Sequence, residues 1–158
     1  PAGPLRETQS RLDSVDAVII NGGSKINESN LEMTLAPQKF VNLSTGKSLN
    51  CTEFLSKYPN VNAFAGIGDP SRFFNTLKAI GLTVEQQQGF TDHHHYSKDS
   101  VAHFSENMPL LMTEKDAVKC GEFAQENYWF LTVDATFADE GAKELISLIT
   151  KRCKNYGL

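Results

Sequence analysis

The sequence predicts an α/β fold: a three-layer α/β/α domain on a mostly parallel sheet, together with a two-stranded antiparallel ribbon. Short strand-like segments at 61–67, 82–87, 109–112 and 128–133 alternate with segments of helical periodicity. Strands that alternate with helices form parallel sheets with helices on both faces. Residues 31–46 instead alternate apolar and polar side chains, with Pro37 interrupting the pattern, which is typical of an antiparallel ribbon.

The residues before the ribbon have a pattern of their own. A short polar helix is expected over residues 5–12. The apolar run 15–20 predicts a buried strand that ends in a tight turn at Asn21, Gly22 and Gly23. The ribbon is therefore expected to link two α/β parts.

Two helices after the ribbon carry capping signals. Asp69 is a suitable N-cap, and Pro70 suits the first turn, where its missing N–H would have no partner. Gly81 is placed to end that helix. Thr113 and Asp116 have the spacing of a capping box at a second helix start. Other helices are expected at 97–104 and over an apolar stripe formed by Ala142, Leu145, Ile146, Leu148 and Ile149.

Composition excludes several classes of protein. The chain has 158 residues, 40% of them hydrophobic and 22% charged, as in a soluble globular domain. Its net charge is −4 and it has no basic stripe with interleaved aromatics, so no nucleic-acid partner is expected. Three cysteines without a Cys-x-x-Cys pair argue against a disulfide framework and a structural zinc site. No apolar run approaches the roughly 20 residues of a membrane helix.

Candidate chemistry lies in the loops after the strands, because ligands of open α/β sheets bind beyond the carboxyl ends of the strands. The loop 92–96 is the most unusual, with an aspartate, three consecutive histidines and a tyrosine. Adjacent side chains diverge and no thiolate completes a zinc set, so no metal site is predicted. A histidine beside a carboxylate could act as a general base near neutral pH. A solvated loop is the alternative.

Two further loops bear on phosphate binding. The chain has no G-x-x-x-x-G-K-[ST] sequence, and Gly66 and Gly68 lack the third glycine of the dinucleotide fingerprint. A plain strand-to-helix turn is therefore favoured over a phosphate cradle. Lys115 could pair with a phosphate at a helix N-terminus, although a helix cap fully explains Thr113 to Asp116.

A set of short stretches, in order along nearly the whole chain, resembles the lipid A 4'-kinase (tetraacyldisaccharide 4'-kinase) family. The stretch 113–120 is especially specific. The matching stretches are residues 1–7, 15–23, 65–74, 92–93, 111–120, 123–124, 127–130 and 133–135. The resemblance covers only the C-terminal half of that family, and the chain opens at Pro1 without an initiator Met. Removal of an initiator Met would also explain this start, but we expect a piece cut from a longer polypeptide.

The resemblance implies transfer of the γ-phosphate of ATP, with Mg²⁺, to the 4'-hydroxyl of tetraacyldisaccharide 1-phosphate, which forms lipid IVA. This reaction would take place at the cytoplasmic face of the Gram-negative inner membrane. Residues 1–30 would be the end of the N-terminal kinase domain, 31–50 the two-stranded ribbon linker, and 51–158 the C-terminal α/β domain, which is related to P-loop kinases. The P-loop, the Mg²⁺-binding carboxylates and a membrane-associated helix would belong to the N-terminal domain. This chain alone is expected to be soluble and inactive.

The same resemblance implies the site residues. The family uses a histidine of the second domain, paired with an aspartate of the first, to help deprotonate the sugar hydroxyl. The matching motif here begins at Asp92 and His93, and the first histidine is the steady feature, so His93 is preferred to His94 and His95. Asp92 is expected to orient that ring or to cap the next helix. Asn21 and Lys115 are expected to line the substrate cleft.

Two other functions remain open from the residues alone. One is a stand-alone α/β module that binds a nucleotide or a sugar phosphate without catalysis. The other is a hydrolase that uses the histidine loop with a bound metal. Neither explains why the family stretches occur in order along the chain.

Overall fold

The computed structural model describes residues 7–22, 30–92, 94–137 and 141–155, and the chain forms two compact units. Unit 1 consists of Pro1–Ala36 and Ala135–Leu158, and unit 2 is Pro37–Asp134. The predicted division differs, because it placed residues 135–158 in one domain with residues 51–134. The C-terminal helix clusters instead with the N-terminal residues.

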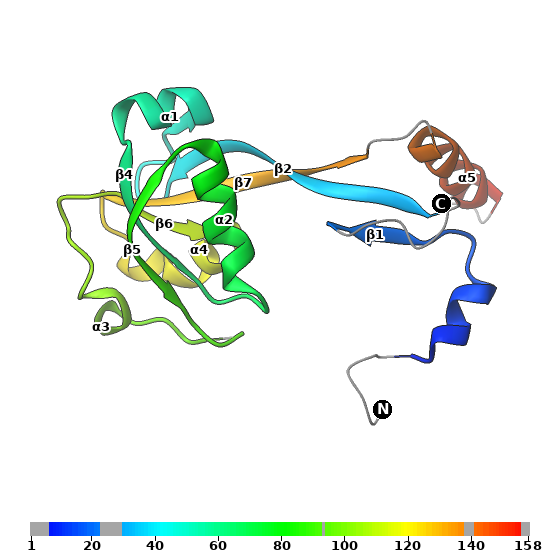
Figure 1. Ribbon diagram of the computed structural model, residues 1–158, viewed down its shortest axis with the longest axis horizontal. Helices are drawn as coiled ribbons and strands as arrows, with labels where there is room; N and C mark the ends of the chain where they lie inside the picture. Colours follow the sequence, from blue (N-terminus) through cyan, green and yellow to red (C-terminus); the bar gives the residue numbers. More distant parts are fainter. Residues whose placement is uncertain (1–6, 23–29, 93, 138–140, 156–158) are drawn as a thin grey trace. The chain divides into compact units, whose positions relative to one another are not determined.

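The elements follow one another as shown in Figure 1. Unit 1 contains η1 (Gln9–Ser14), β1 (Ile19–Asn21) and α5 (Gly141–Asn155). Two strands run through both units, β2 (Leu31–Asn42) and β7 (Tyr128–Phe137). Unit 2 contains β3 (Ser48–Asn50), α1 (Cys51–Lys57), β4 (Asn60–Ala65), α2 (Pro70–Ile80), β5 (Thr83–Gly89), α3 (Lys98–Val101), β6 (Leu110–Thr113), α4 (Glu114–Cys120) and η2 (Gly121–Phe123). None of the helices within the described residues is both long and apolar enough to span a membrane.

The sheet confirms the predicted fold class. Its strand order is β1-β2-β7-β6-β4-β5, and β3 pairs with β2. The pairs β1–β2, β4–β5, β4–β6 and β6–β7 are parallel, whereas β2–β3 is antiparallel. The order of β4, β5, β6 and β7 requires helical crossovers, as expected for strands that alternate with helices.

Side chains of the central strands of unit 2 alternate between two cores. In β4, Val61, Ala63 and Ala65 pack in one cluster with Phe54 of α1 and residues of α2, including Leu77. Phe64, between them, packs in the other cluster with residues of α3 and α4. Because successive side chains of a strand point to opposite faces, α1 and α2 cover one face and α3 and α4 the other (Figure 1). Unit 2 is therefore a three-layer α/β/α domain.

The predicted helix caps are present. Asp69 accepts a hydrogen bond from the Ser71 amide at 3.1 Å, Pro70 is the first residue of α2, and Gly81 ends the helix with φ of 103°. This positive φ suits glycine, which has no Cβ to clash. At α4, the Thr113 hydroxyl accepts from the Asp116 amide at 3.2 Å.

The ribbon differs from the prediction. The strand β2 continues through Pro37 as one element of 12 residues, and its antiparallel partner within residues 31–50 is only the short β3. Proline fits an extended backbone and costs only one possible ladder bond. The longer partner of β2 is β7, whose contacts run antiparallel: Thr34 with Thr136 (2.9 Å), Lys39 with Thr132 (3.3 Å) and Leu43 with Tyr128 (2.8 Å).

Helix α1 was not predicted, although its start carries a complete capping box. Asn50 accepts from the amide of Glu53 at 2.9 Å, and Glu53 accepts from the amide of Asn50 at 2.9 Å. The spacing Asn50-x-x-Glu53 is the signal that could have found it.

The two units differ in how much apolar surface they bury. Every hydrophobic residue that is buried among the described residues lies between Phe40 and Leu131, inside unit 2. The predicted buried strand at 15–20 is shorter, beginning at Ile19, and that side chain is 46% exposed. Large exposed apolar side chains of unit 1 are Leu12, Val15, Ile19, Leu35, Ile146 and Ile149. Among the apolar side chains of unit 1 whose burial the structure describes, none is fully buried and these six are exposed.

Two of the three cysteines provide a test of this burial pattern. Cys120, the last residue of α4, lies in the core, and burial, together with the nearby Asp116 carboxylate, raises the pKa of its thiol to about 12. Cys153 on α5 is exposed. At pH 8 a group with so high a pKa stays protonated, and the thiolate is the nucleophile. We expect iodoacetamide at pH 8 to label Cys153 first and Cys120 only in urea, as peptide mass spectrometry would record. Equal labelling of both in the native protein would contradict the described core.

Candidate functional site

Three connections that follow parallel strands meet at one edge of the unit 2 sheet. The first begins at Gly66, after β4, and the second consists of residues 90–97, after β5. The third is the junction of β6 with α4, because β6 ends at Thr113 and α4 begins at the next residue. The carboxyl ends of parallel strands share one edge of a sheet, where ligands of this fold class bind. Three of the predicted residues, Asp92, His93 and Lys115, belong to these connections.

A buried carboxylate joins the three connections. The side chain of Asp116 is fully buried. Its Oδ2 accepts hydrogen bonds from the Gly66 amide (3.0 Å) and the Thr113 hydroxyl (2.6 Å), and its Oδ1 accepts from the Tyr96 hydroxyl (3.0 Å). Burying a charge is costly unless it is hydrogen-bonded, and each bond to a charged group contributes about 1.5–3 kcal/mol. The three hydrogen bonds therefore compensate for the burial of the carboxylate. They also fix the positions of Gly66, Tyr96 and Thr113 relative to one another.

Two of the predicted site residues are in direct contact. The Nζ atom of Lys115, in the first turn of α4, lies 2.6 Å from Oδ1 of Asp92. Both side chains are about half exposed, at 47% and 43%, so the pair adds at most about 1 kcal/mol to stability. The contact instead fixes the position of the loop after β5 relative to α4, the helix after β6.

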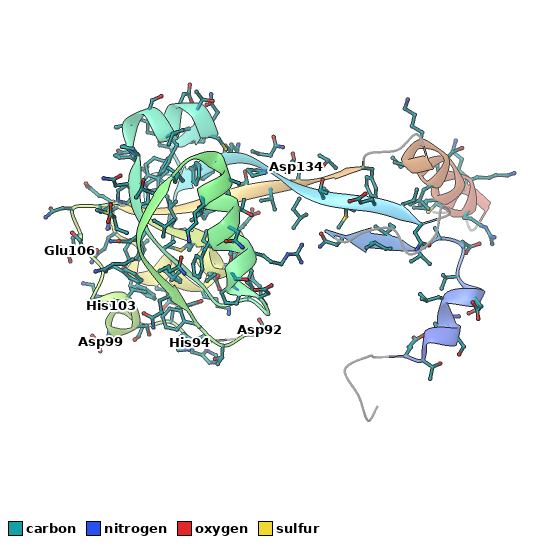
Figure 2. The ribbon with its side chains drawn as sticks, in the orientation of Figure 1. Asp92, His94, Asp99, His103, Glu106 and Asp134 are labelled. Carbon is teal, nitrogen blue, oxygen red and sulfur yellow. The ribbon has the colours of Figure 1, made fainter. Side chains whose placement is uncertain are left out.

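The histidines of this loop have different surroundings. His93 lies outside the described residues. His94 stacks on Phe90, with ring centroids 4.5 Å apart, and meets the Tyr96 ring edge-on at 5.0 Å. Its Nε2 is buried without a hydrogen-bond partner, and its carbonyl accepts from Nζ of Lys119 at 3.3 Å. His95 is exposed. Figure 2 shows His94 and Asp92 in the loop that follows β5.

Asn21, the fourth predicted residue, lies in unit 1. It ends β1 in register with Met33 of β2, and the amide of the following Gly22 donates to the Met33 carbonyl at 3.0 Å. Asp92 and Lys115 lie in unit 2. The structure therefore brings Asp92 and Lys115 together and describes Asn21 separately.

Sequence patterns did not identify the residues that organise this edge. Asp116 was expected only as part of a helix cap, and Tyr96 only as the end of a polar loop. Gly66 was considered for a phosphate cradle, whereas its amide donates to a carboxylate 50 residues further along the chain. No local signal connects positions so far apart in sequence.

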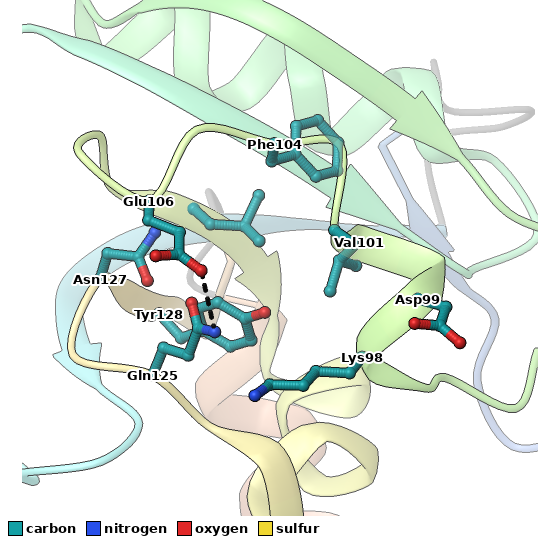
Figure 3. Close-up of a pocket in the computed structure, with 10 residues that line it drawn as sticks. Lys98, Asp99, Val101, Phe104, Glu106, Gln125, Asn127 and Tyr128 are labelled. Carbon is teal, nitrogen blue, oxygen red and sulfur yellow. Dashed lines mark hydrogen bonds between the residues drawn. The ribbon is translucent and has the colours of Figure 1, made fainter.

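Two hollows of unit 2 lie at opposite edges of its sheet. A cavity of about 220 Å³ is lined by Lys98, Phe104, Glu106, Gln125, Tyr128 and neighbouring residues (Figure 3). It lies at the opposite edge, where β6 and β7 begin, and Asp92 and Lys115 are not among the residues that line it. A groove of about 590 Å³ at the carboxyl end of β6 is lined by Lys39, Asn50, Glu114, Thr132 and Asp134, among others. Within the described residues, no group of three His, Cys, Asp or Glu side chains is arranged to hold a metal ion.

Comparisons with known proteins agree over nearly the whole chain. The family model for tetraacyldisaccharide-1-P 4'-kinase, LpxK, matches residues 1–154. The tetraacyldisaccharide 4'-kinase of Mannheimia succiniciproducens is 49% identical over 156 residues, which is 98% of this chain and 46% of that protein. The enzyme of the same name from Colwellia psychrerythraea is 48% identical over 151 residues, covering 92% of this chain and 44% of the relative. The chain thus spans less than half the length of these relatives.

A solved structure is also similar. The crystal structure of LpxK from Aquifex aeolicus, in complex with ATP, superposes with a TM-score of 0.63 at 25% sequence identity. The match covers 96% of this chain and 47% of that one. The fold predicted from the sequence is therefore also the fold of a solved member of this family. The chain belongs to the tetraacyldisaccharide-1-P 4'-kinase family.

Proposed function

We propose that this chain is the C-terminal part of a kinase that transfers the γ-phosphate of ATP to the 4'-hydroxyl of tetraacyldisaccharide 1-phosphate, forming lipid IVA in lipid A biosynthesis. The observation that carries the proposal is the match of the family model over residues 1–154. The contact of Asp92 with Lys115 at the carboxyl edge of the sheet supports it, because both residues belong to stretches that resemble the family.

In this proposal His93 is the general base that helps to remove the proton from the 4'-hydroxyl. A positioned base contributes roughly 10²- to 10⁴-fold in rate. His94 suits this role poorly, because its ring packs between Phe90 and Tyr96 and its Nε2 is buried. Asp92 positions the loop and its histidine, while Lys115 and Asn21 line the cleft that takes the sugar phosphate.

ATP and Mg²⁺ are proposed to bind mainly to an N-terminal P-loop domain of the same polypeptide. The Aquifex aeolicus relative is a complex with ATP, and the sequence of this chain has no P-loop. Residues 1–30 are assigned to the end of that domain and residues 31–50 to the linker. The exposed apolar side chains of unit 1, such as Leu35 and Ile146, supply a surface that a further domain would cover. Helix α5 clusters with residues 1–36, so we assign it to the same domain.

The location follows from the substrate. A disaccharide with four acyl chains stays in a bilayer, so the kinase must reach it at a membrane surface. We place the complete protein peripherally at the cytoplasmic face of the inner membrane of Gram-negative bacteria, where ATP is present.

The first test is the exchange of His93 for alanine in the complete protein. We expect turnover of the disaccharide to fall by roughly 10²- to 10⁴-fold, because the base is lost, while ATP still binds with unchanged affinity. His95→Ala is the matched control, since His95 is exposed in the same loop. A radiolabelled phosphate-transfer assay and calorimetry with ATP provide the measurements. Full turnover by His93→Ala would remove the assigned role.

The second test concerns the contact between Asp92 and Lys115. Because Lys115 is bonded to Asp92, we expect the variants Asp92→Asn and Lys115→Gln each to lower turnover, and the double variant to lose little more than one of them. Coupled residues behave non-additively, whereas independent ones add. The exposed Lys78→Gln in α2 is the control. Losses that multiply in the double variant would show that the two residues act independently and that their contact does not shape the cleft.

The third test separates the kinase from a stand-alone nucleotide-binding module. We expect calorimetry of this chain alone to detect no micromolar binding of ATP with Mg²⁺, because the chain has no P-loop backbone to surround the phosphates. The complete protein in the same experiment should bind. Micromolar affinity of the isolated chain would favour the binding module instead.

A further inference from the structure

One short helix holds the loop after β5 at three points. Helix α4 supplies Lys115, Asp116 and Lys119, and each contacts a different residue of the loop. Lys115 pairs with Asp92 (2.6 Å), Lys119 donates to the carbonyl of His94 (3.3 Å), and Asp116 accepts from Tyr96 (3.0 Å). The contacts thus fall on alternate residues of the loop, at 92, 94 and 96.

The contact of Asp116 with Tyr96 is the most buried of the three. Asp116 is fully buried, and the Tyr96 ring packs against Phe64 at 5.0 Å and Phe90 at 5.2 Å. Burial, with the nearby Asp116 carboxylate, raises the pKa of Tyr96 above its usual range. The hydroxyl is therefore protonated at neutral pH, as its hydrogen bond to Asp116 requires. Nζ of Lys119, 5.6 Å from the ring centroid, is the cation facing this ring.

Gly66 leaves the space in which this contact forms. A Cβ atom at position 66 would collide with the Tyr96 hydroxyl and lie 3.2 Å from Oδ1 of Asp116. The Gly66 amide meanwhile donates to Oδ2 of the same carboxylate. The turn after β4, the loop after β5 and the start of α4 therefore all meet at the two carboxylate oxygens of Asp116.

We propose that Asp116 and Tyr96 are positioning residues for the phosphoryl transfer: they fix the connection between β5 and α3 against the turn after β4. The inference rests on the proposed function, since it assigns these residues to the reaction of that site. Neither residue need touch the substrate. Their effect is to keep the described residues of the loop, Asp92 and His94 included, in one arrangement at the carboxyl edge. A displacement of about 1 Å at a reacting group can cost roughly 10²-fold in rate.

The first experiment uses the complete protein with Tyr96→Phe, which keeps the ring and removes only the donor. We expect kcat to fall by about ten- to a hundredfold, with KM for ATP unchanged. Tyr128→Phe is the matched control, because Tyr128 is also buried in the core beneath α4 but at the opposite edge. It should retain the kcat of the unmodified enzyme. Unchanged kcat in Tyr96→Phe, or an equal loss in both variants, would overturn the proposal.

Asp116→Asn tests the carboxylate itself. Asparagine has one acceptor oxygen where aspartate has two, so its NH2 group must replace the acceptor of Tyr96 or the acceptor shared by Gly66 and Thr113. We expect a loss of kcat at least as large as in Tyr96→Phe, again with KM for ATP unchanged. If this variant does not fold, Tyr96→Phe decides the question alone. A folded Asp116→Asn with full kcat would contradict the proposed role.

The second experiment tests the geometry without any kinase activity. The free energy of unfolding is measured by urea denaturation of this chain for Gly66→Ala, Tyr96→Phe and the double variant. Gly66→Ala should be destabilising, and less so in the Tyr96→Phe background, where the colliding hydroxyl is absent. Additive effects would overturn the inference. If the complete protein without any substitution has no kinase activity, the proposed function is wrong. The urea denaturation of these three variants would then still test the contact between Gly66 and Tyr96.

Discussion

The arrangement at the carboxyl edge of the sheet depends on one buried negative charge. The Asp116 carboxylate has no contact with solvent and is held by three donors from three different connections. Each of these hydrogen bonds to a buried charged group contributes about 1.5–3 kcal/mol, and the three together are a large part of the stability of a small domain. The charge therefore acts as a constraint: the turn after β4, the loop after β5 and the start of α4 must be formed together, or the carboxylate must be exposed to water.

The parts of the fold that could be predicted are those with a local cause. Asp69, Pro70 and Gly81 define both ends of α2 by their own backbone chemistry, and Thr113 starts α4 in the same way. The strand after Pro59 follows from its apolar run, which is buried on both faces of the sheet. Helix α1 was missed although Asn50 and Glu53 carry a full capping signal, because its single buried side chain, Phe54, gives little periodicity.

The parts that could not be predicted have non-local causes. Asp116 and Gly66 are 50 residues apart, and only the adjacent placement of β4 and β6 brings them together. The contact of Asp92 with Lys115 has the same origin, because both residues were considered from their own segments and 23 positions separate them. The long β2 was divided at Pro37, since the sequence does not show that β7 pairs with both parts of it. The resemblance to the family is what pointed to Asp92 and Lys115 as site residues. Without it, the residue types alone favoured a solvated loop around Asp92 and a helix cap around Lys115.

Unit 2 is an uninterrupted stretch of chain, whereas unit 1 is formed by two stretches on either side of it. Near the ends of unit 2, the backbone of Lys39 is bonded to the side chain of Thr132, so the points where the chain enters and leaves lie next to each other. Unit 2 thus has the topology of an insertion. Domains generally fold as units in the order in which they are synthesised, and unit 1 cannot close until its last helix has left the ribosome. Translation therefore separates the two stretches of unit 1 by the synthesis of the whole insertion, and we expect unit 2 to fold before unit 1 is complete.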